Sequence, residues 1–175
     1  MDKVWSKCAV EGIARADAII GIGGGATTDL AGFAASSWLR GISWYAFPTS
    51  LAGMVDAAIG GKTGVNAKSG KNLIGSFYSP SEVLIDLSFL NTLPKRDLSA
   101  GMAEVIKCGF IADYRILNLA QDDDLDYQQL IARSIKVKAD VVSKDFKESK
   151  LREILNYGHT LGHAIEKNSG YRLRH

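Results

Sequence analysis

Ala18-Ile19-Ile20-Gly21-Ile22-Gly23-Gly24-Gly25-Ala26 is the stretch that decides the fold class of this chain. A short apolar run that ends in clustered glycines is typical of a buried strand that leads into a tight turn. Thr27-Thr28-Asp29 follows with residues that favour the start of a helix, and residues 30–39 have a helical pattern. The stretch therefore predicts a strand, turn and helix within a parallel α/β layer.

The alternation of strand and helix patterns continues to about residue 90 and then stops. Strands are predicted at residues 42–47 and 83–87, a short helix at 51–59, and a long glycine-rich loop at 60–72. After Pro94 only helical patterns occur, at residues 98–111, 116–120, 127–142 and 151–167. We therefore expect an α/β part and a helical part that meet near residues 90–96.

The glycine turn has a functional and a structural interpretation. Residues 21–26 fit the pattern G-x-G-x-x-A between a strand and a helix, where dinucleotides bind because the backbone and the helix N-terminus accept a phosphate. The acid that such sites use for the ribose is missing from the next strand, at residues 45–48. Nucleotide binding and a purely structural turn both remain open, and so do a ligand role and a helix-start role for Asp29.

The lysines of the glycine-rich loop suit a phosphate. Gly60-Gly61-Lys62-Thr63 resembles the end of a P-loop, but Asp56 stands where the first glycine belongs, so the spacing disfavours a Walker site. Lys62, with Lys71-Asn72 nearby, still offers point charges and an amide to an anion. The alternative is that these are solvated loop lysines.

Two histidines four residues apart, His159 and His163, indicate a polar site on a helix. Ideal helical spacing puts Arg152, Asn156 and both histidines on one stripe about 60° wide. Such a stripe favours a polar cavity over an apolar core contact. From spacing alone, the histidine pair predicts two metal ligands, and Glu104 could supply a carboxylate. Glu104 and Lys107 share a helix face and could instead form a surface ion pair.

Composition limits the class of protein. The chain has 175 residues, 46% of them apolar and 23% charged, with a net charge of +2, which is typical of a globular protein. Lysines between residues 136 and 152 are interrupted by acids, so we expect no nucleic-acid binding, and no apolar run is long enough to span a membrane. Cys8 and Cys108 form no metal or redox motif, which favours a reduced cytosolic protein with a small anionic substrate.

Several ordered sequence blocks together resemble the 3-dehydroquinate synthase family over residues 19–175. The individual motifs are weak, but the set is specific. The blocks are Gly23-Gly24-Gly25 with residues 29–33, Pro48-Thr49-Ser50-Leu51 with Val55-Asp56, Gly60-Gly61-Lys62-Thr63, residues 70–75, Leu93-Pro94, residues 101–107, and residues 155–166.

The resemblance implies an α/β fold in which a parallel Rossmann-like layer is followed by the start of an all-helical metal-binding domain. Residues 1–93 would be part of the NAD-binding domain, and residues 94–175 the first part of the helical metal and substrate domain. Because the family is about twice this length, we expect an internal fragment that is inactive by itself.

The resemblance also implies a reaction. A synthase of this family is a lyase of the shikimate pathway, which supplies aromatic amino acids, and it would convert 3-deoxy-D-arabino-heptulosonate 7-phosphate to 3-dehydroquinate and phosphate. NAD would transiently oxidise a ring hydroxyl, phosphate would eliminate, the hydride would return, and the ring would open and close again by an aldol step. A divalent metal, zinc or cobalt, would act as a Lewis acid. We expect a cytoplasmic homodimer when the protein is full length.

Roles carried over from the family replace the simple histidine pair. The implied metal ligands are Glu104, His159 and His175, whereas His163 would contact the substrate phosphate. Implied catalytic residues are Lys62, Lys107, Asn156 and Glu148, and the implied substrate contacts are Arg40 (towards a neighbouring subunit), Asn72, Lys138, Arg152 and His163. The implied NAD contacts are Gly24, Gly25, Asp29, Thr49, Ser50, Asp56, Lys62, Lys71 and Thr92.

Three alternatives stay open beside this hypothesis. A related sugar-phosphate cyclase, such as a 2-deoxy-scyllo-inosose synthase or an aminodehydroquinate synthase, would share the metal and NAD. Lys138 and Arg152 favour a substrate with a carboxylate, which the inosose synthases lack. A metal-dependent polyol dehydrogenase is a more distant possibility, and the isolated fragment could lack catalysis altogether.

Overall fold

The core of the first part is a parallel sheet. We describe it from a computed structural model, which covers residues 1–170, 172 and 173, apart from the side chains of Lys71 and His163. Strands β1 (Ala18–Gly23), β2 (Ser43–Pro48) and β5 (Glu82–Val83) run parallel in the order β1-β2-β5. The predicted α/β layer is therefore confirmed.

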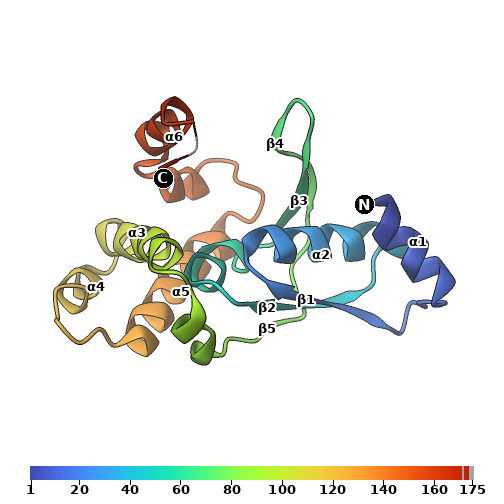
Figure 1. Ribbon diagram of the computed structural model, residues 1–175, viewed down its shortest axis with the longest axis horizontal. Helices are drawn as coiled ribbons and strands as arrows, with labels where there is room; N and C mark the ends of the chain where they lie inside the picture. Colours follow the sequence, from blue (N-terminus) through green and yellow to red (C-terminus); the bar gives the residue numbers. More distant parts are fainter. Residues whose placement is uncertain (171, 174–175) are drawn as a thin grey trace.

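Helix α2 (Gly25–Ser37) packs closely on this sheet because its contact face is made of small residues. Ala34 and Ala35 are fully buried, and a Cβ atom at Gly32 would lie only 2.7 Å from Cζ2 of Trp44. Helix α1 (Asp2–Val10) precedes β1 at the edge of the layer (Figure 1). The glycine turn thus begins a helix that starts earlier than the pattern at residues 30–39 predicts.

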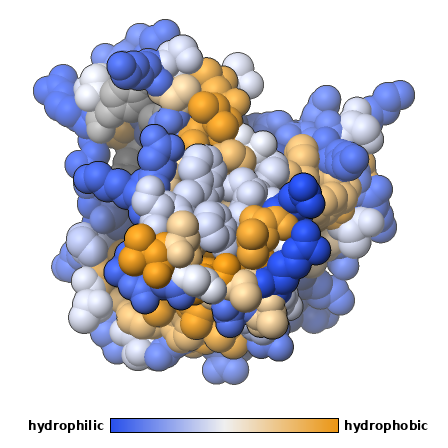
Figure 2. All heavy atoms as spheres, turned by 90° about the vertical axis from the view of Figure 1, so that its right-hand side faces the viewer, coloured by the Kyte–Doolittle hydropathy of each residue, from blue (hydrophilic) through white to orange (hydrophobic). Residues whose placement is uncertain are grey.

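Large apolar side chains also remain exposed in this part of the molecule. Val10 of α1 and Ile20 and Ile22 of β1 are all more than half exposed. Figure 2 shows apolar residues on the face that carries α1. The described residues therefore do not bury all of their large apolar side chains.

The predicted glycine-rich loop at residues 60–72 is wrong, because the segment forms an antiparallel hairpin. Strands β3 (Lys62–Ala67) and β4 (Gly70–Phe77) pair with each other and project from the body of the molecule (Figure 1). Gly64 lies opposite Gly75, where a Cβ atom on Gly75 would lie 2.2 Å from the carbonyl oxygen of Thr63. The glycines that suggest a loop are required by this close approach of two strands.

The second part is helical, as predicted. It contains α3 (Lys95–Ile111), α4 (Tyr114–Leu119) and α5 (Tyr127–Lys144), preceded by a 3₁₀ segment, η3 (Leu87–Thr92). These elements share an apolar core with the π-helical turn η2 (Gly53–Ala57) of the first part. A Cβ atom on Gly101 of α3 would lie 2.5 Å from Cβ of Leu51, so the two parts meet at close contact.

The predicted helix at residues 151–167 is interrupted. Residues Leu151–Asn156 form a 3₁₀ segment, η4, and α6 begins at His159 and ends at Asn168. Gly158 between them has φ +80°, a left-handed conformation that ends one helix and redirects the next. The predicted single stripe of Arg152, Asn156, His159 and His163 therefore does not exist as one helix face.

The connection after α2 also carries unusual backbone. Residues Trp38–Arg40 form a short 3₁₀ segment, η1, in which Leu39 and Arg40 have φ values of +48° and +66°. No helix in the described part of the chain is long and apolar enough to cross a membrane.

Candidate active site

Glu104 and His159 come together from two different helices. Glu104 lies in the middle of α3, and His159 is the first residue of α6, which lies beside α3 (Figure 1). Nε2 of His159 is 3.1 Å from Oε1 of Glu104, and Oε2 of Glu104 forms an ion pair with Lys107. Burial by itself would raise the pKa of Glu104, but the contacts with His159 and Lys107 hold it below its usual range.

A second carboxylate links the π-helical turn to the helical part. Lys138 of α5 donates to Oδ1 of Asp56 at 2.5 Å and also to the backbone carbonyl of Asp56. Nζ of Lys107 lies 3.9 Å from the same Oδ1 atom. Both lysines are only 7% exposed, so two ammonium groups and two carboxylates form one largely buried cluster.

The pKa of Asp56 in this cluster and that of Asp29 beside it are shifted in opposite directions. Burial would raise the pKa of Asp56, but Lys138 and Lys107 hold it below its usual range. Burial and the neighbouring charge of Asp56 raise the pKa of Asp29 to about 7, against the opposing effect of Lys138. Burial also lowers the pKa of Lys138, and its contact with Asp56 only partly offsets this.

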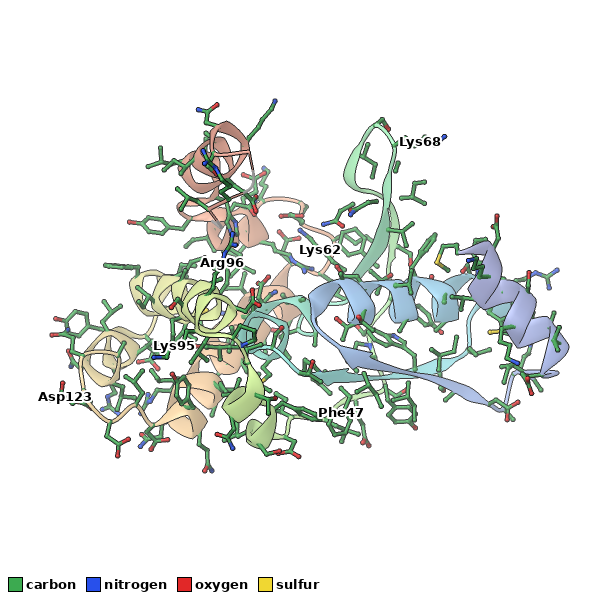
Figure 3. All side chains as sticks on the ribbon, in the orientation of Figure 1. Phe47, Lys62, Lys68, Lys95, Arg96 and Asp123 are labelled. Atoms are coloured by element: carbon green, nitrogen blue, oxygen red, sulfur yellow. The ribbon has the colours of Figure 1, made fainter. Side chains whose placement is uncertain are left out.

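A second group of polar residues lies at the base of the hairpin. Lys62, at the start of β3, forms an ion pair with Glu148, and Nδ2 of Asn156 is 3.4 Å from Oε1 of Glu148. The Lys62 side chain is half exposed and lies between the hairpin and the helical part (Figure 3). A cavity of about 290 Å³ is lined by Lys62, Asn72 and Asp29. Lys62 gives this cavity a cationic side chain, and Asn72 an amide, with which an anion could interact.

Arg152 is fixed beside the second group. It is 2% exposed, and its Nη1 atom donates to the backbone carbonyl of Phe146 at 2.6 Å. Its guanidinium lies 5.9 Å from the ring centroid of Phe77. Gly60 has φ +116°, which favours glycine, and a Cβ atom there would lie 2.6 Å from Nη2 of Arg152.

The Glu104 and His159 pair borders a cavity of about 360 Å³. Its walls include the apolar residues Ile106, Phe110 and Tyr157 and the polar residues of the pair. An imidazole nitrogen and a carboxylate oxygen are ordinary ligands of zinc and cobalt, so the donor set fits such a metal. Among the described residues no cluster of three or more potential metal ligands is found. His175, the third implied ligand, lies outside the described residues.

Two sequence models of one protein family together match the whole chain. The model for the 3-dehydroquinate synthase N-terminal domain matches residues 1–100, and the model for the C-terminal domain matches residues 101–175. The chain belongs to the 3-dehydroquinate synthase family. The resemblance deduced from the sequence blocks is therefore confirmed.

Known proteins of this and related families agree with the assignment. The 3-dehydroquinate synthase of Streptomyces coelicolor is 58% identical over 98% of this chain, and the match covers 49% of that protein. The chain thus spans about half the length of the curated relatives it matches.

Two solved structures have the same fold. A 2-epi-5-epi-valiolone synthase from Streptomyces hygroscopicus subsp. jinggangensis, with NAD⁺ and Zn²⁺ bound, is 30% identical with a TM-score of 0.88; the match covers 98% of this chain and 51% of that one. A 2-deoxy-scyllo-inosose synthase complexed with carbaglucose-6-phosphate, NAD⁺ and Co²⁺ is 32% identical with a TM-score of 0.86, over 98% and 49% of the two chains.

The fold of this 3-dehydroquinate synthase family member brings together many of the implied site residues. Glu104, His159, Lys107, Asp56 and Lys138 form one group, and Lys62, Glu148 and Asn156 form another. Their roles stay predictions. The side chains of His163 and Lys71 lie outside the described residues.

The remaining implied residues are spread along the α/β part and its border. Gly24 and Gly25 lie at the start of α2 beside the π-helical turn. A Cβ atom on Gly25 would be 2.8 Å from Cβ of Ala57, so packing against this turn also favours a glycine at position 25. The backbone N–H of Thr49 donates to Gly23, and Ser50 Oγ accepts from Gly53. Thr92 lies in η3 and donates to the carbonyl of Phe89, and Arg40 follows the opposite end of α2 from the glycine turn.

Sequence reasoning does not single out Asp145, although the structure makes it a centre of hydrogen bonding. The residue follows α5 directly, is 8% exposed, and accepts bonds from residues 149, 150 and 152. The signal that could have found it is an aspartate at the end of a helix followed by a short polar segment, a pattern typical of side-chain to backbone bonding.

Proposed function

We propose that this chain forms the NAD and metal sites of a 3-dehydroquinate synthase, which converts 3-deoxy-D-arabino-heptulosonate 7-phosphate to 3-dehydroquinate and phosphate. The observation that carries the proposal is the pairing of Glu104 and His159, next to the buried cluster of Lys107, Asp56 and Lys138. Such a cluster is typical of a catalytic site, because burying several charges costs free energy that packing alone does not require.

The metal ligands in this proposal are Glu104, His159 and His175, with zinc or cobalt as the ion. NAD lies against the glycine turn, with contacts from Gly24, Gly25, Asp29, Thr49, Ser50, Asp56, Lys62, Lys71 and Thr92. When bound, NAD supplies reversible hydride transfer and the metal supplies Lewis acidity. The support for both is the donor set of the described ligands and the strand, turn and helix arrangement at β1 and α2.

The substrate phosphate is held by Lys62 and Asn72 in the cavity beside the hairpin, and the family resemblance adds His163 to this set. Lys62 and Asn72 line this cavity, and the Lys62 ammonium is half exposed. Phosphate must displace Glu148 from Lys62 or bind beside the pair, and departure of the phosphate restores the pair. Arg40 reaches the phosphate of a second subunit, so the proposal includes a homodimer.

The buried cations hold the substrate carboxylate and ring hydroxyls. Arg152 offers its remaining N–H groups to the carboxylate together with Lys138, because only Nη1 is engaged with a backbone carbonyl. Lys107 and Asn156 lie close to Glu104 and Glu148 and polarise the reacting hydroxyls. Glu148 holds the reacting groups as a carboxylate, because its bond to Lys62 keeps its pKa below the usual range and leaves it able to accept a hydrogen bond from a substrate hydroxyl.

The proposal includes the class and surroundings of the enzyme. It is a lyase of the shikimate pathway in the cytoplasm, its substrate is a small anionic sugar phosphate, and it binds neither nucleic acid nor membrane. A related cyclase that acts on glucose 6-phosphate is the second candidate, because the 2-deoxy-scyllo-inosose synthase structure matches the fold closely. Arg152 and Lys138 favour the first candidate, since a carboxylate gives both cations a partner.

A chimeric enzyme tests the proposal. In it, this chain replaces the matching half of the Streptomyces coelicolor 3-dehydroquinate synthase, and phosphate release is measured with each substrate. We expect turnover of the heptulosonate phosphate and none of glucose 6-phosphate, without net NADH release. The reverse preference would overturn the proposal in favour of an inosose synthase, and net NADH release would favour a dehydrogenase. The isolated 175-residue chain is expected to show no turnover.

A further inference from the structure

The segment between α5 and η4 is folded around one carboxylate. Oδ1 of Asp145 accepts hydrogen bonds from the backbone N–H of Ser149 at 2.8 Å and from its hydroxyl at 2.9 Å. Oδ2 accepts from the backbone N–H groups of Lys150 at 2.9 Å and Arg152 at 3.0 Å. All four hydrogen bonds converge on a side chain that is 8% exposed, so residues 146–152 close into a compact loop.

This loop carries two of the residues assigned to the substrate. Glu148 has φ +60°, a conformation that a residue with a side chain adopts only where its surroundings hold it. From that position its carboxylate meets Lys62 of the hairpin and Asn156. Arg152 closes the other end of the loop, because its guanidinium donates to the carbonyl of Phe146.

The loop also has an apolar contact with the hairpin. The ring of Phe146 lies 5.7 Å from that of Phe77, and a Cβ atom on Gly61 would be 2.9 Å from the Phe146 ring. The Arg152 guanidinium near the Phe77 ring and the Lys62–Glu148 pair also join the loop to the hairpin, but these side-chain contacts do not fix the backbone between residues 146 and 152 as the bonds to Asp145 do. An exposed ion pair contributes little to holding a conformation.

We infer that Asp145 is a positioning residue, which holds loop 146–152 in the conformation that presents Glu148 and Arg152 to the substrate. Asp145 itself contacts neither Lys62 nor any other residue assigned to the phosphate among the described residues, so it acts through the loop. What Glu148 and Arg152 do for the substrate rests on the proposed function, whereas the ordering of the loop does not.

The electrostatics of Asp145 agree with this role. The backbone N–H groups of Ser149, Arg152 and Lys150 hold the pKa of its carboxyl well below its usual range. The side chain is therefore a carboxylate throughout the neutral range, with both oxygens accepting. In Asp145→Asn the amide NH₂ group would replace one of these oxygens and face N–H donors that it cannot satisfy.

Limited trypsin digestion of the 175-residue chain tests the ordering of the loop. Lys147 and Lys150 lie in the loop and are exposed, so they report its local opening. We expect cleavage at these two lysines to be about tenfold faster in Asp145→Asn, and less accelerated in Ser149→Ala, which loses only the hydroxyl donor. Asp140→Asn, an exposed position on α5, is the matched control and should cleave at the wild-type rate.

The outcomes of this digestion are distinct. Unchanged cleavage at Lys147 and Lys150 in Asp145→Asn would overturn the inference. Equal acceleration at lysines throughout the chain would also overturn it, because Asp145 would then support the whole fold rather than the loop. Acceleration confined to the loop supports the ordering role.

Kinetics of the chimera test the positioning role. Asp145→Asn should raise the KM for the heptulosonate phosphate about tenfold while the affinity for NAD and the zinc content stay as in the wild type. In an Arg152→Lys background the same change should add little, because both act on one contact. Full additivity of the two effects, or an equal loss of NAD affinity, would overturn the positioning role.

A wild-type chimera without turnover would refute the proposed function, while the digestion result would still decide the role of Asp145 in the loop.

Discussion

Nε2 of His159 lies 3.1 Å from Oε1 of Glu104, although 55 residues separate the two in the chain. Glu104 lies in the middle of α3, which packs on the core through its buried face. His159 follows Gly158, whose left-handed conformation turns the chain into α6. The pair therefore exists only because the first residue of α6 lies next to the middle of α3. This makes both side chains sensitive reporters of the proposed metal site.

Glu104→Gln should weaken zinc binding to the chimera by tenfold or more, because a neutral amide replaces a carboxylate ligand. Zinc titration followed by calorimetry measures the loss. Glu153→Gln is the matched control, since Glu153 is exposed in η4, and it should bind zinc normally. Unchanged zinc affinity in Glu104→Gln would remove Glu104 from the ligand set.

The two histidines of α6 should differ in what they support. His159→Ala is expected to lose bound zinc, whereas His163→Ala should keep near-normal zinc content and lose turnover, because the family assigns it to the phosphate. Metal analysis and phosphate release from the same preparations distinguish the two effects. Loss of zinc in His163→Ala would restore the simple pair of ligands four residues apart.

Gly158→Ala should disturb the site through the backbone. Gly158 has φ +80°, and a Cβ atom placed on it would meet nothing within 4 Å, so conformational strain is the only direct penalty, about 1 to 2 kcal/mol. We expect lower stability in urea unfolding together with weaker zinc binding. Gly12→Ala, with φ +67° and equally open space, should cost similar stability and leave zinc binding unchanged.

Lys138→Met should destabilise the chain by about 2 kcal/mol or more, because it leaves the partly buried Asp56 carboxylate without its main partner. The double variant Lys138→Met with Asp56→Asn should recover part of this loss. Lys136→Met, two residues earlier on α5 and less buried, is the control and should be nearly neutral. Urea unfolding of the wild type, Lys138→Met, Asp56→Asn and the double variant measures the coupling, and simple additivity would show that the pair is not linked.

The raised pKa of Asp29 predicts a pH dependence of stability. Its folded-state pKa of about 7 lies above the ordinary value of 3.8, so the folded state binds the proton more tightly. The stability due to this proton is complete below the ordinary pKa and is lost as the pH rises through about 7. Asn resembles the protonated acid, so the advantage of Asp29→Asn in free energy of unfolding should grow between about pH 4 and about pH 8.

Asp123→Asn provides the comparison for this pH series, because Asp123 is exposed at the far side of the helical part (Figure 3). Its stability should follow the wild type at every pH. An advantage of Asp29→Asn that is constant or shrinks as the pH rises would show that Asp29 is charged in the folded state throughout this range.

The parts of the fold that the sequence predicts are those set by local patterns. The apolar run before Gly23 and the small residues of α2 specify a parallel strand and its helix, and the helical periodicities after Pro94 specify α3 and α5. Local patterns do not predict the hairpin, because Gly64 and Gly75 resemble loop glycines until their pairing is known. They also do not predict the break between η4 and α6 at Gly158, because an isolated glycine is tolerated inside a helical pattern.

The sequence by itself determined the family, the α/β and helical parts, and the residue types that the chemistry needs, because these are set by local spacing and by ordered blocks. Tertiary structure alone decided the partners of those residues. Glu104 meets His159, Asp56 meets Lys138, and Lys62 meets Glu148 because separate elements pack on a shared apolar core. Packing between distant segments depends on the whole chain, so no local pattern contains it.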